Sequence, residues 1–176
     1  MQHLASVVIN QWLIDSSETS TPLIGTINQL LIQPEDLTIR LYGIGEGIKQ
    51  TSHFVRTDQI QINRNGLSIV RSFDVVGERD DFVREQGIIK QHCLLIGYKV
   101  ISNKTIIGRV TDYSFSSPLF RIEKIFVQPP IWQRIHTSHR IFTRKHIIEV
   151  DPIKKIVRLK DDKAPIRSRA SQAMPA

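Results

Sequence analysis

Short segments in which apolar and polar residues alternate run along most of the chain. In Arg121–Val127 the alternation has a period of two, which is typical of a strand with one face in the core. Pro129-Pro130 ends this segment, because proline cannot donate to a strand ladder. The same pattern predicts strands over 7–14, 22–32, 37–42, 54–62 and 67–73, and again over 94–100, 106–112, 121–127, 140–145, 146–150 and 153–159. The chain is therefore predicted to be all-β.

The segments between these strands carry turn and loop signals. Gly43–Gly47 is predicted to be a flexible loop, and Asn63-Arg64-Asn65-Gly66 is a strong hairpin turn signal. Residues 77–91 are predicted to form a connector of one or two helical turns, because their acids lie early and Gly87 could end a helix. The tail, residues 161–176, is polar, contains two prolines and shows no period, so we expect disorder.

The two parts of the chain repeat one another. Leu23–Ile27 matches Ile106–Val110, with Gly25 and Gly108 aligned 83 residues apart. The later correspondences keep the same order: Leu37–Leu41 with Phe120–Val127, Gln59–Asn63 with Ile147–Asp151, and Ile69-Val70 with Ile156-Val157. The offset reaches 88 near the end, as loops of unequal length would produce. A fixed internal period predicts two copies of one structural module.

One stretch of the second copy carries a family resemblance. It runs from Leu95-Ile96-Gly97 through Ile107–Asp112, and continues with Ile122–Val127 and Ile147–Asp151. These residues resemble the PRC-barrel family, the small β-barrel shared by the photosynthetic reaction-centre H subunit and the ribosome maturation factor RimM. The resemblance covers about residues 92–160, and residues 5–73 look like a second, more divergent copy.

The resemblance implies both an architecture and a class of role. The architecture is two tandem small PRC-like β-barrels, residues 1–76 and 92–160, joined by the connector 77–91 and followed by the tail 161–176. The role is that of a binding or assembly module without catalytic residues. Members of the family bind ribosomal protein, RNA-processing machinery or the subunits of membrane complexes.

Composition indicates the cellular compartment and shows that charge is unevenly distributed along the chain. The single cysteine, Cys93, excludes an internal disulfide and fits a reducing compartment. No apolar stretch approaches the roughly 18 residues of a membrane span, and Met1–Leu4 lacks a basic signal region, so we expect a cytoplasmic protein. Residues 1–90 hold 8 Lys and Arg against 11 Asp and Glu, a net −3, whereas residues 91–176 hold 16 against 6, a net +10. Such a basic half favours an anionic partner.

The segment Ile131–Lys145 combines these bases with aromatic residues. The candidate macromolecule-binding residues are Trp132, Arg134, His136, His139, Arg140, Arg144 and Lys145. Bases beside a ring that can stack are the ingredients of RNA binding. Trp and Arg are also enriched in the hot spots of protein interfaces. A third interpretation is a surface loop with solvated charges, and the sequence leaves all three open.

No group of residues predicts a catalytic, cofactor or metal site. His136 and His139 have a spacing compatible with zinc, but the surrounding positive charge opposes a cation. The acids of residues 78–85 lie in a polar connector and not in a cleft, and no helix follows Gly43–Gly47 to complete a phosphate loop. Cys93 is best interpreted as a structural thiol.

These observations favour a non-enzymatic adaptor or assembly module with a protein partner. The first alternative is an RNA-binding or ribosome-maturation factor, which the net charge of residues 91–176 and the family resemblance both allow. The second alternative is a peripheral component of a membrane-bound complex, attached to an anionic surface through the bases of residues 134–169.

Overall fold

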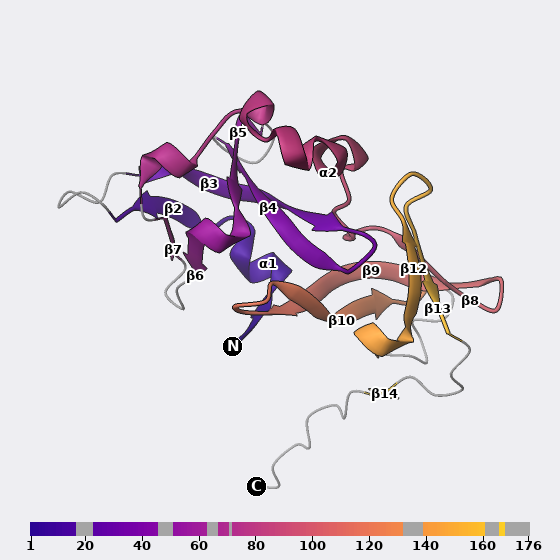
Figure 1. Ribbon diagram of the computed structural model, residues 1–176. Coiled ribbons are helices and arrows are strands. Elements are labelled where there is room, and N and C mark those ends of the chain that lie inside the picture. Colours follow the sequence, from indigo (N-terminus) through magenta and orange to yellow (C-terminus); the bar gives the residue numbers. More distant parts are fainter. Residues whose placement is uncertain are drawn as a thin grey trace, which may run out of the picture.

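The computed structural model describes residues 1–16, 23–45, 51–62, 67–70, 72–131, 139–160 and 166–167. These residues form mostly β structure, with the strands hydrogen-bonded into one curled, open sheet and only short helices (Figure 1). The prediction of a predominantly β chain is confirmed.

The elements follow one another in two series. The first contains β1 (Gln2–Leu4), α1 (Ala5–Val8), β2 (Trp12–Asp15), β3 (Leu23–Gln33), β4 (Thr38–Gly45), β5 (His53–Arg56), β6 (Ile60–Ile62) and β7 (Leu67–Val70). The second contains β8 (Lys99–Ser102), β9 (Thr105–Ser116), β10 (Arg121–Gln128), β11 (Arg140–Thr143), β12 (Ile147–Asp151), β13 (Ile156–Leu159) and β14 (Ile166–Arg167). Below, the first half means β2–β7 and the second half means β8–β13.

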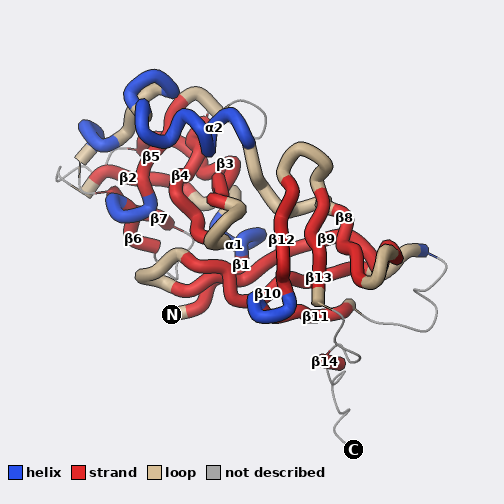
Figure 2. The backbone as a smooth tube through the Cα atoms, turned by 45° about the vertical axis from the view of Figure 1, so that its right-hand side comes forward, coloured by secondary structure: helices blue, strands red, loops and turns tan. Residues whose placement is uncertain are grey.

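Short helices join these strands. The 3₁₀ turns are η1 (Thr57–Gln59), η2 (Phe73–Val75), η3 (Arg79–Asp81), η4 (Val83–Glu85) and η6 (Arg144–His146), and α2 spans Gln86–Gln91. With η3, η4 and α2, the connector 77–91 does contain short helical turns, but Gly87, which was expected to end a helix, lies inside α2. Figure 2 shows α2 at the end of the molecule that holds β3, β4 and β5.

The two halves pair their strands in the same order. In the first half β2 pairs with β3, β3 with β4 and β4 with β5, while β7 runs parallel to β2 and antiparallel to β6. In the second half β8 pairs with β9, β9 with β10 and β10 with β11, while β13 runs parallel to β8 and antiparallel to β12. The internal repeat read from the sequence therefore corresponds to a repeat in strand topology.

The repeat extends to the irregularities of the sheet. Gly25 lies opposite Leu13 and Gly108 opposite Val100, and the register shifts directly after each pair. The register of the β3–β4 pair shifts at two further positions. The register of the β9–β10 pair shifts at the two counterpart positions, 83 residues later. Bulges bend a strand and increase its twist. The two halves are therefore curled by the same devices at the same places.

The halves meet through equivalent residues. The only residues paired between β4 and β10 are Thr38 and Arg121, which are themselves counterparts 83 residues apart. On either side, Ile39 N–H donates to the Phe120 carbonyl at 2.8 Å and Ile122 N–H donates to the Leu37 carbonyl at 2.9 Å. An interface in which residue i contacts j and j contacts i has two-fold character. The two halves thus pack about an approximate two-fold axis within one chain.

Each half also reaches across this axis with the segment that precedes it. Strand β1 pairs with β9 of the second half, with His3 opposite Phe115, and α1 contacts the same strand. Reciprocally, α2 contacts β3 of the first half, where Ile32 N–H donates to the Cys93 carbonyl at 3.0 Å. The leading segments are therefore exchanged between the halves.

Most of the buried side chains form one core shared by both halves. The largest fully buried residues in it are Tyr42, Tyr113, Phe115, Leu13, Ile27 and Leu30. The hydroxyls of Tyr42 and Tyr113 make no hydrogen bond within the described part of the chain, and burial raises the pKa of both. Both phenols therefore stay neutral at physiological pH.

A smaller core fixes the connector to the outer face of the first half. It contains Leu31 and Leu41 from the sheet, Phe54 from β5, and Phe82 and Ile89 from the connector. The rings of Phe54 and Phe82 meet edge to face with centroids 6.1 Å apart. This packing explains why the connector, a polar segment without a clear hydrophobic period, adopts a defined conformation.

An ion pair closes this connector over β5. The Arg56 side chain donates two hydrogen bonds to the Glu85 carboxylate, at 2.7 and 3.2 Å, and its guanidinium lies 5.2 Å from the centroid of the Phe82 ring. The hydrogen bonds from Arg56 hold the pKa of Glu85 below its ordinary value of 4.5. The charged carboxylate therefore stabilises the folded state.

Replacing Glu85 with glutamine is expected to make the free energy of unfolding change less as the pH falls from neutral to acid. A carboxyl whose pKa is lowered on folding stabilises the protein above its unfolded pKa, and this contribution disappears as the pH falls through the folded pKa. At neutral pH the loss should not exceed about 1 kcal/mol, because the pair is partly exposed. Urea unfolding of wild type and variant at pH 7 and pH 3 measures the difference in free energy of unfolding. The control is Asp80→Asn, at an exposed residue of the connector. A difference between wild type and variant that grows toward pH 3 would contradict the prediction.

Several predicted element boundaries in the first half are wrong. The strand expected over 7–14 is helical until Val8 and becomes a strand only at Trp12, because Asn10 has a positive φ of 78°. The glycines at 43 and 45, assigned to a flexible loop, belong to β4, where they lie against β3. The single strand expected over 54–62 is interrupted by η1, and 67–73 ends as a strand at Val70.

Similar corrections apply to the second half. The strand expected over 94–100 begins only at Lys99, because Leu95 and Gly97 have φ values of 61° and 84°. Residues 144 and 145 belong to η6 instead of β11, and the last strand starts at Ile156 after a turn. Within the tail expected to be disordered, Ile166–Arg167 pairs with β11. The turn 63–66 lies outside the described residues.

Candidate functional site

The structure places four of the seven predicted binding residues. His139 and Lys145 are exposed, whereas Arg140 and Arg144 are half-buried, and all four lie on or beside β11 and η6. Trp132, Arg134 and His136 lie outside the described residues. Of the segment 128–145, the structure thus describes the two ends, residues 128–131 and 139–145.

β11 is held to the core on one face and by local polar contacts at its end. Phe142 lies opposite Ile125 of β10 and packs against the shared core. At the start of η6, the Thr143 hydroxyl lies 2.8 Å from Nδ1 of His146, and the two residues form a reciprocal cap. His146 therefore has a structural role, and the cap fixes the direction in which Arg144 and Lys145 project.

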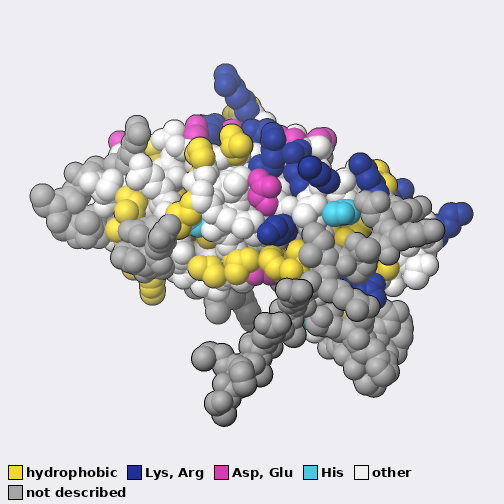
Figure 3. All heavy atoms as spheres, turned by 90° about the horizontal axis from the view of Figure 1, so that it is seen from below, with side chains coloured by type: hydrophobic (Ala, Val, Ile, Leu, Met, Phe, Trp, Pro, Cys, Tyr) yellow, Lys and Arg dark blue, Asp and Glu magenta, His cyan; other side chains and the backbone are white. Residues whose placement is uncertain are grey.

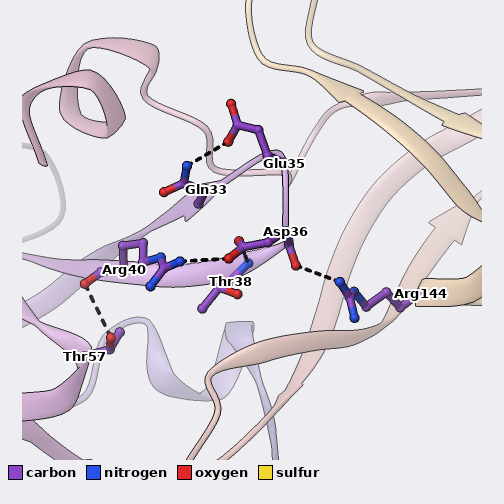
Figure 4. Close-up of polar contacts among 7 residues, drawn as sticks. All are labelled: Gln33, Glu35, Asp36, Thr38, Arg40, Thr57 and Arg144. Atoms are coloured by element: carbon purple, nitrogen blue, oxygen red, sulfur yellow. Dashed lines mark hydrogen bonds and ion pairs between the residues drawn. The ribbon is translucent and has the colours of Figure 1, made fainter.

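Arg144 links the second half to the first. Its guanidinium donates to the main-chain carbonyl of Asp36 at 3.1 Å, in the turn between β3 and β4 (Figure 4). The Asp36 carboxylate accepts from the Thr38 main-chain N–H at 2.9 Å and from the Arg40 guanidinium at 2.8 Å. Arg144 is thus part of the junction between the halves, and the sequence-based assignment of a binding role to it has a structural alternative.

A mixed-charge groove of about 380 Å³ lies beside this junction. Its walls are the β3–β4 turn, including Glu35, and the η6–β12 segment with Lys145, Ile147 and Ile148. Glu123 and Glu149 face the same groove, and Glu149 is paired with Arg158 at 3.2 Å. Its lining contains three acids, Glu35, Glu123 and Glu149, and three bases, Arg144, Lys145 and Lys160, a balance that does not favour a polyanion.

A second groove, of about 350 Å³, opens where the 128–145 segment leaves β10. Its apolar lining residues are Ile106 and Pro129-Pro130-Ile131, and Lys99 and Arg109 also line it. Ile106 is 48% exposed and Ile131 is 74% exposed. We call these lining residues the apolar groove. Sequence reasoning treated the two prolines only as a strand terminator and did not predict this site.

Basic side chains gather over the second half. On the face shown in Figure 3, Lys and Arg side chains lie from the centre toward the side of the second half, and Asp and Glu side chains lie among those at the centre. From Lys124 to Ile148 the sequence contains no Asp or Glu.

Three features of the described residues bear on metal binding and nucleophilic chemistry. Among them, no three His, Cys, Asp or Glu side chains cluster in a way that could hold a metal ion. Cys93 is buried, and desolvation raises the pKa of its thiol to about 11, so the nucleophilic thiolate is scarce at neutral pH. In the connector, Glu78 and Asp81 form a cap at η3, and Glu85 is paired with Arg56.

Within the described part of the chain, no helix has both the length and the apolar character needed to cross a membrane. Comparison of the chain with protein-family models finds no match, and comparison with curated proteins finds none either.

Proposed function

We propose that this chain is a non-enzymatic adaptor in which two PRC-like barrels hold a protein partner at the second half. The observation that carries the proposal is the apolar groove, which is lined by two exposed isoleucines and two basic residues. Exposed apolar surface rimmed by polar residues is characteristic of protein-interaction sites. The groove adjoins the segment with Trp132 and Arg134, residue types that are common in interface hot spots.

The repeated strand order supports the PRC-like part of the proposal. Each half has six strands in one pairing order, with a glycine at the same place in the second strand. The motif Ile107–Asp112 contains that glycine, Gly108, and ends in a residue with a structural partner. The Asp112 carboxylate accepts hydrogen bonds from the main-chain N–H and the hydroxyl of Ser6 in α1. The residues of the motif thus fit a scaffold more than a reactive site.

An RNA-binding or ribosome-maturation role is the second candidate. The observation in its favour is the net charge of +10 on residues 91–176, together with the acid-free stretch from Lys124 to Ile148. Binding to RNA phosphates releases counterions and weakens steeply with salt. The acids lining the groove beside Arg144 favour the protein interpretation over this one.

The test is affinity purification of the tagged full chain from its native lysate, with and without nuclease. A protein partner that survives nuclease should fall by about tenfold or more with Ile131→Ser and Arg109→Ala combined, because hot-spot truncations exceed 1 kcal/mol each. The matched control, Lys104→Ala with Lys155→Ala, removes exposed bases elsewhere on the second half. Partners that vanish with nuclease would favour the RNA candidate, and a groove variant that binds as well as wild type would contradict the proposed site.

A further inference from the structure

Two turns at one end of the second half carry exposed isoleucines. Residues 95–98 form the turn before β8, and residues 152–155 form the turn that joins β12 to β13. Ile96 in the first turn is 40% exposed, and Ile153 in the second is 90% exposed. Tight turns are dominated by Gly, Pro, Asn, Asp and Ser. A β-branched apolar side chain in both turns therefore needs an explanation other than turn formation.

Parallel pairing brings these two turns to the same end of the sheet. β13 runs parallel to β8, with Ile156 opposite Lys99, so the turns that precede the two strands are neighbours. They are joined directly, because the Lys99 main-chain N–H donates to the Lys155 carbonyl at 2.9 Å. Figure 1 shows the hairpin of β12 and β13 rising beyond β9, with its turn standing clear of the strands.

Local contacts hold both isoleucines outward. In the first turn, the Tyr98 N–H donates to the Leu95 carbonyl at 3.0 Å, and the Leu95 side chain is fully buried. In the second turn, the Asp151 carboxylate accepts from the main-chain N–H of Lys154 at 2.9 Å. The exposure of the two apolar side chains is therefore fixed by the fold of their turns.

The residues beside these isoleucines are mostly basic. Lys154 and Lys155 follow Ile153 directly, Lys99 adjoins Lys155, and all three lysines are exposed. The acid of this region, Asp151, lies 3.7 Å from the ammonium group of Lys154. Within the described part of the chain, neither Lys99 nor Lys155 forms an ion pair. The two turns thus combine apolar tips with unneutralised positive charge.

The equivalent end of the first half has neither feature. The register of β2 on β3 matches that of β8 on β9, so Ile9 corresponds to Ile96 and Trp12 to Lys99. Ile9 is half-buried and packs against the shared core, whereas Ile96 is exposed. The fold itself therefore requires neither the exposed isoleucine nor the lysine at these places.

We propose that this end of the second half docks on the surface of an anionic phospholipid membrane. Ile96 and Ile153 enter the boundary between headgroups and acyl chains, while Lys99, Lys154 and Lys155 lie among the phosphates. Interfacial binding of this kind grows with the apolar area buried and with attraction to anionic lipids.

The shape of the site favours a lipid surface over a folded partner. The isoleucines project from turns instead of lining a groove, and a fluid bilayer accepts a projecting side chain without a matching pocket. The inference goes beyond the proposed adaptor function, because the isoleucines of the apolar groove are Ile106 and Ile131.

The first test is flotation of the full chain with vesicles of phosphatidylcholine, alone or with about a quarter phosphatidylserine. We expect binding to the anionic vesicles only, with a constant below the roughly 10⁴ M⁻¹ of a single myristoyl chain. Ile153→Asp should lower this constant by about tenfold or more, because it removes a buried isoleucine. The matched control is Ile148→Asp, at a 62% exposed isoleucine near the opposite end of the same hairpin, which should bind like wild type.

The second test concerns the charges. Lys99→Glu with Lys155→Glu should lower the constant by about 25-fold or more, since each base near an anionic surface contributes about fivefold. The control, Lys145→Glu with Lys160→Glu, makes the same change of charge at the opposite end of the hairpin, where the Lys160 N–H donates to the His146 carbonyl. It should lose less than about threefold, because charges beyond the Debye length are screened.

A fluorescent label tests insertion directly. Ile153→Cys carrying an environment-sensitive dye should shift its emission to shorter wavelength on anionic vesicles, and the same dye at Ile148→Cys should not. The native Cys93 is buried and does not compete for the label. Absence of flotation with anionic vesicles, or equal losses from Ile153→Asp and Ile148→Asp, would overturn the docking site. Binding that follows the lysines but ignores Ile153 would overturn the insertion of the turns.

The result is separable from that of the adaptor proposal. A protein partner that is lost with the groove variant and retained with Ile153→Asp leaves the adaptor intact, whatever the vesicles show. A protein captured by wild type and lost with Ile153→Asp, in the absence of flotation, would assign these turns to a protein surface and overturn the choice of a membrane.

Discussion

Replacing Gly108 with alanine is expected to lower the free energy of unfolding by about 2–4 kcal/mol. A Cβ atom at this position would lie 2.3 Å from the Gln128 carbonyl oxygen and 2.7 Å from a methyl group of Val127. The carbonyl belongs to the main chain of β10, so relief requires the two strands to separate. The φ of 157° is also unfavourable for a side chain. Urea unfolding monitored by circular dichroism measures the change.

Two other glycines provide matched controls. At Gly25, the counterpart in the first half, the shortest distance from a Cβ would be 2.9 Å, to a side-chain methyl group of Ile44, and not 2.3 Å to a main-chain oxygen, so Gly25→Ala should cost less, about 1–2 kcal/mol. At Gly87, in α2, nothing lies within 4 Å, and alanine should stabilise the helix by about 0.5–1 kcal/mol. If Gly108→Ala and Gly87→Ala proved equally stable, close strand approach would not be the reason for the glycine.

Replacing Phe82 with alanine is expected to cost about 3–5 kcal/mol. Phe82 is only 3% exposed and is the connector's aromatic anchor, in contact with Phe54 and beneath the Arg56 guanidinium. Its removal leaves a cavity in the smaller core, in which Ile89 is the other buried side chain from the connector. Amide exchange of α2 should therefore accelerate more than that of β9. Hydrogen exchange followed by mass spectrometry distinguishes this local effect from global unfolding.

The adjacent residue is the control for this variant. Val83 is 76% exposed, so Val83→Ala should change stability by less than about 0.5 kcal/mol. Equal losses at positions 82 and 83 would show that the connector tolerates any change poorly, instead of depending on one buried ring.

The alternation of residues predicted the strands with one buried face, and the repeat predicted their correspondence. Arg121–Val127 falls within β10, and the alignment of Gly25 with Gly108 is matched by the strand register. The sequence-based match of Ile69-Val70 with Ile156-Val157 differs by two residues from the alignment that the structure gives. The structure aligns Leu67–Val70 with Ile156–Leu159, because Leu13 and Val100 are counterparts and lie opposite Ser68 and Val157.

The errors lie where long-range contacts override the local pattern. Residues 7–14 and 94–100 are apolar enough for strands, yet Asn10 and Gly97 turn the chain with positive φ. Their N–H groups donate to the carbonyls of Ile27 and Val110 on the neighbouring strand, a cross-strand contact that hydrophobic periodicity does not reveal. For the candidate site, composition identified the bases but not that Arg144 would be used to join the halves.

The exchange of leading segments has a consequence for how the chain folds during synthesis. Gln2–Leu4 is made well before its partner on β9, which is more than a hundred residues away, with His3 opposite Phe115. When β2–β7 have been synthesised, β1 therefore cannot pair until β9 has been made. The Ile32 N–H group of β3 likewise lacks its acceptor until Cys93 has been made. Contacts of such separation slow folding. We expect the early chain to remain incomplete, and exposed to chaperones and proteases, until most of the protein has been translated.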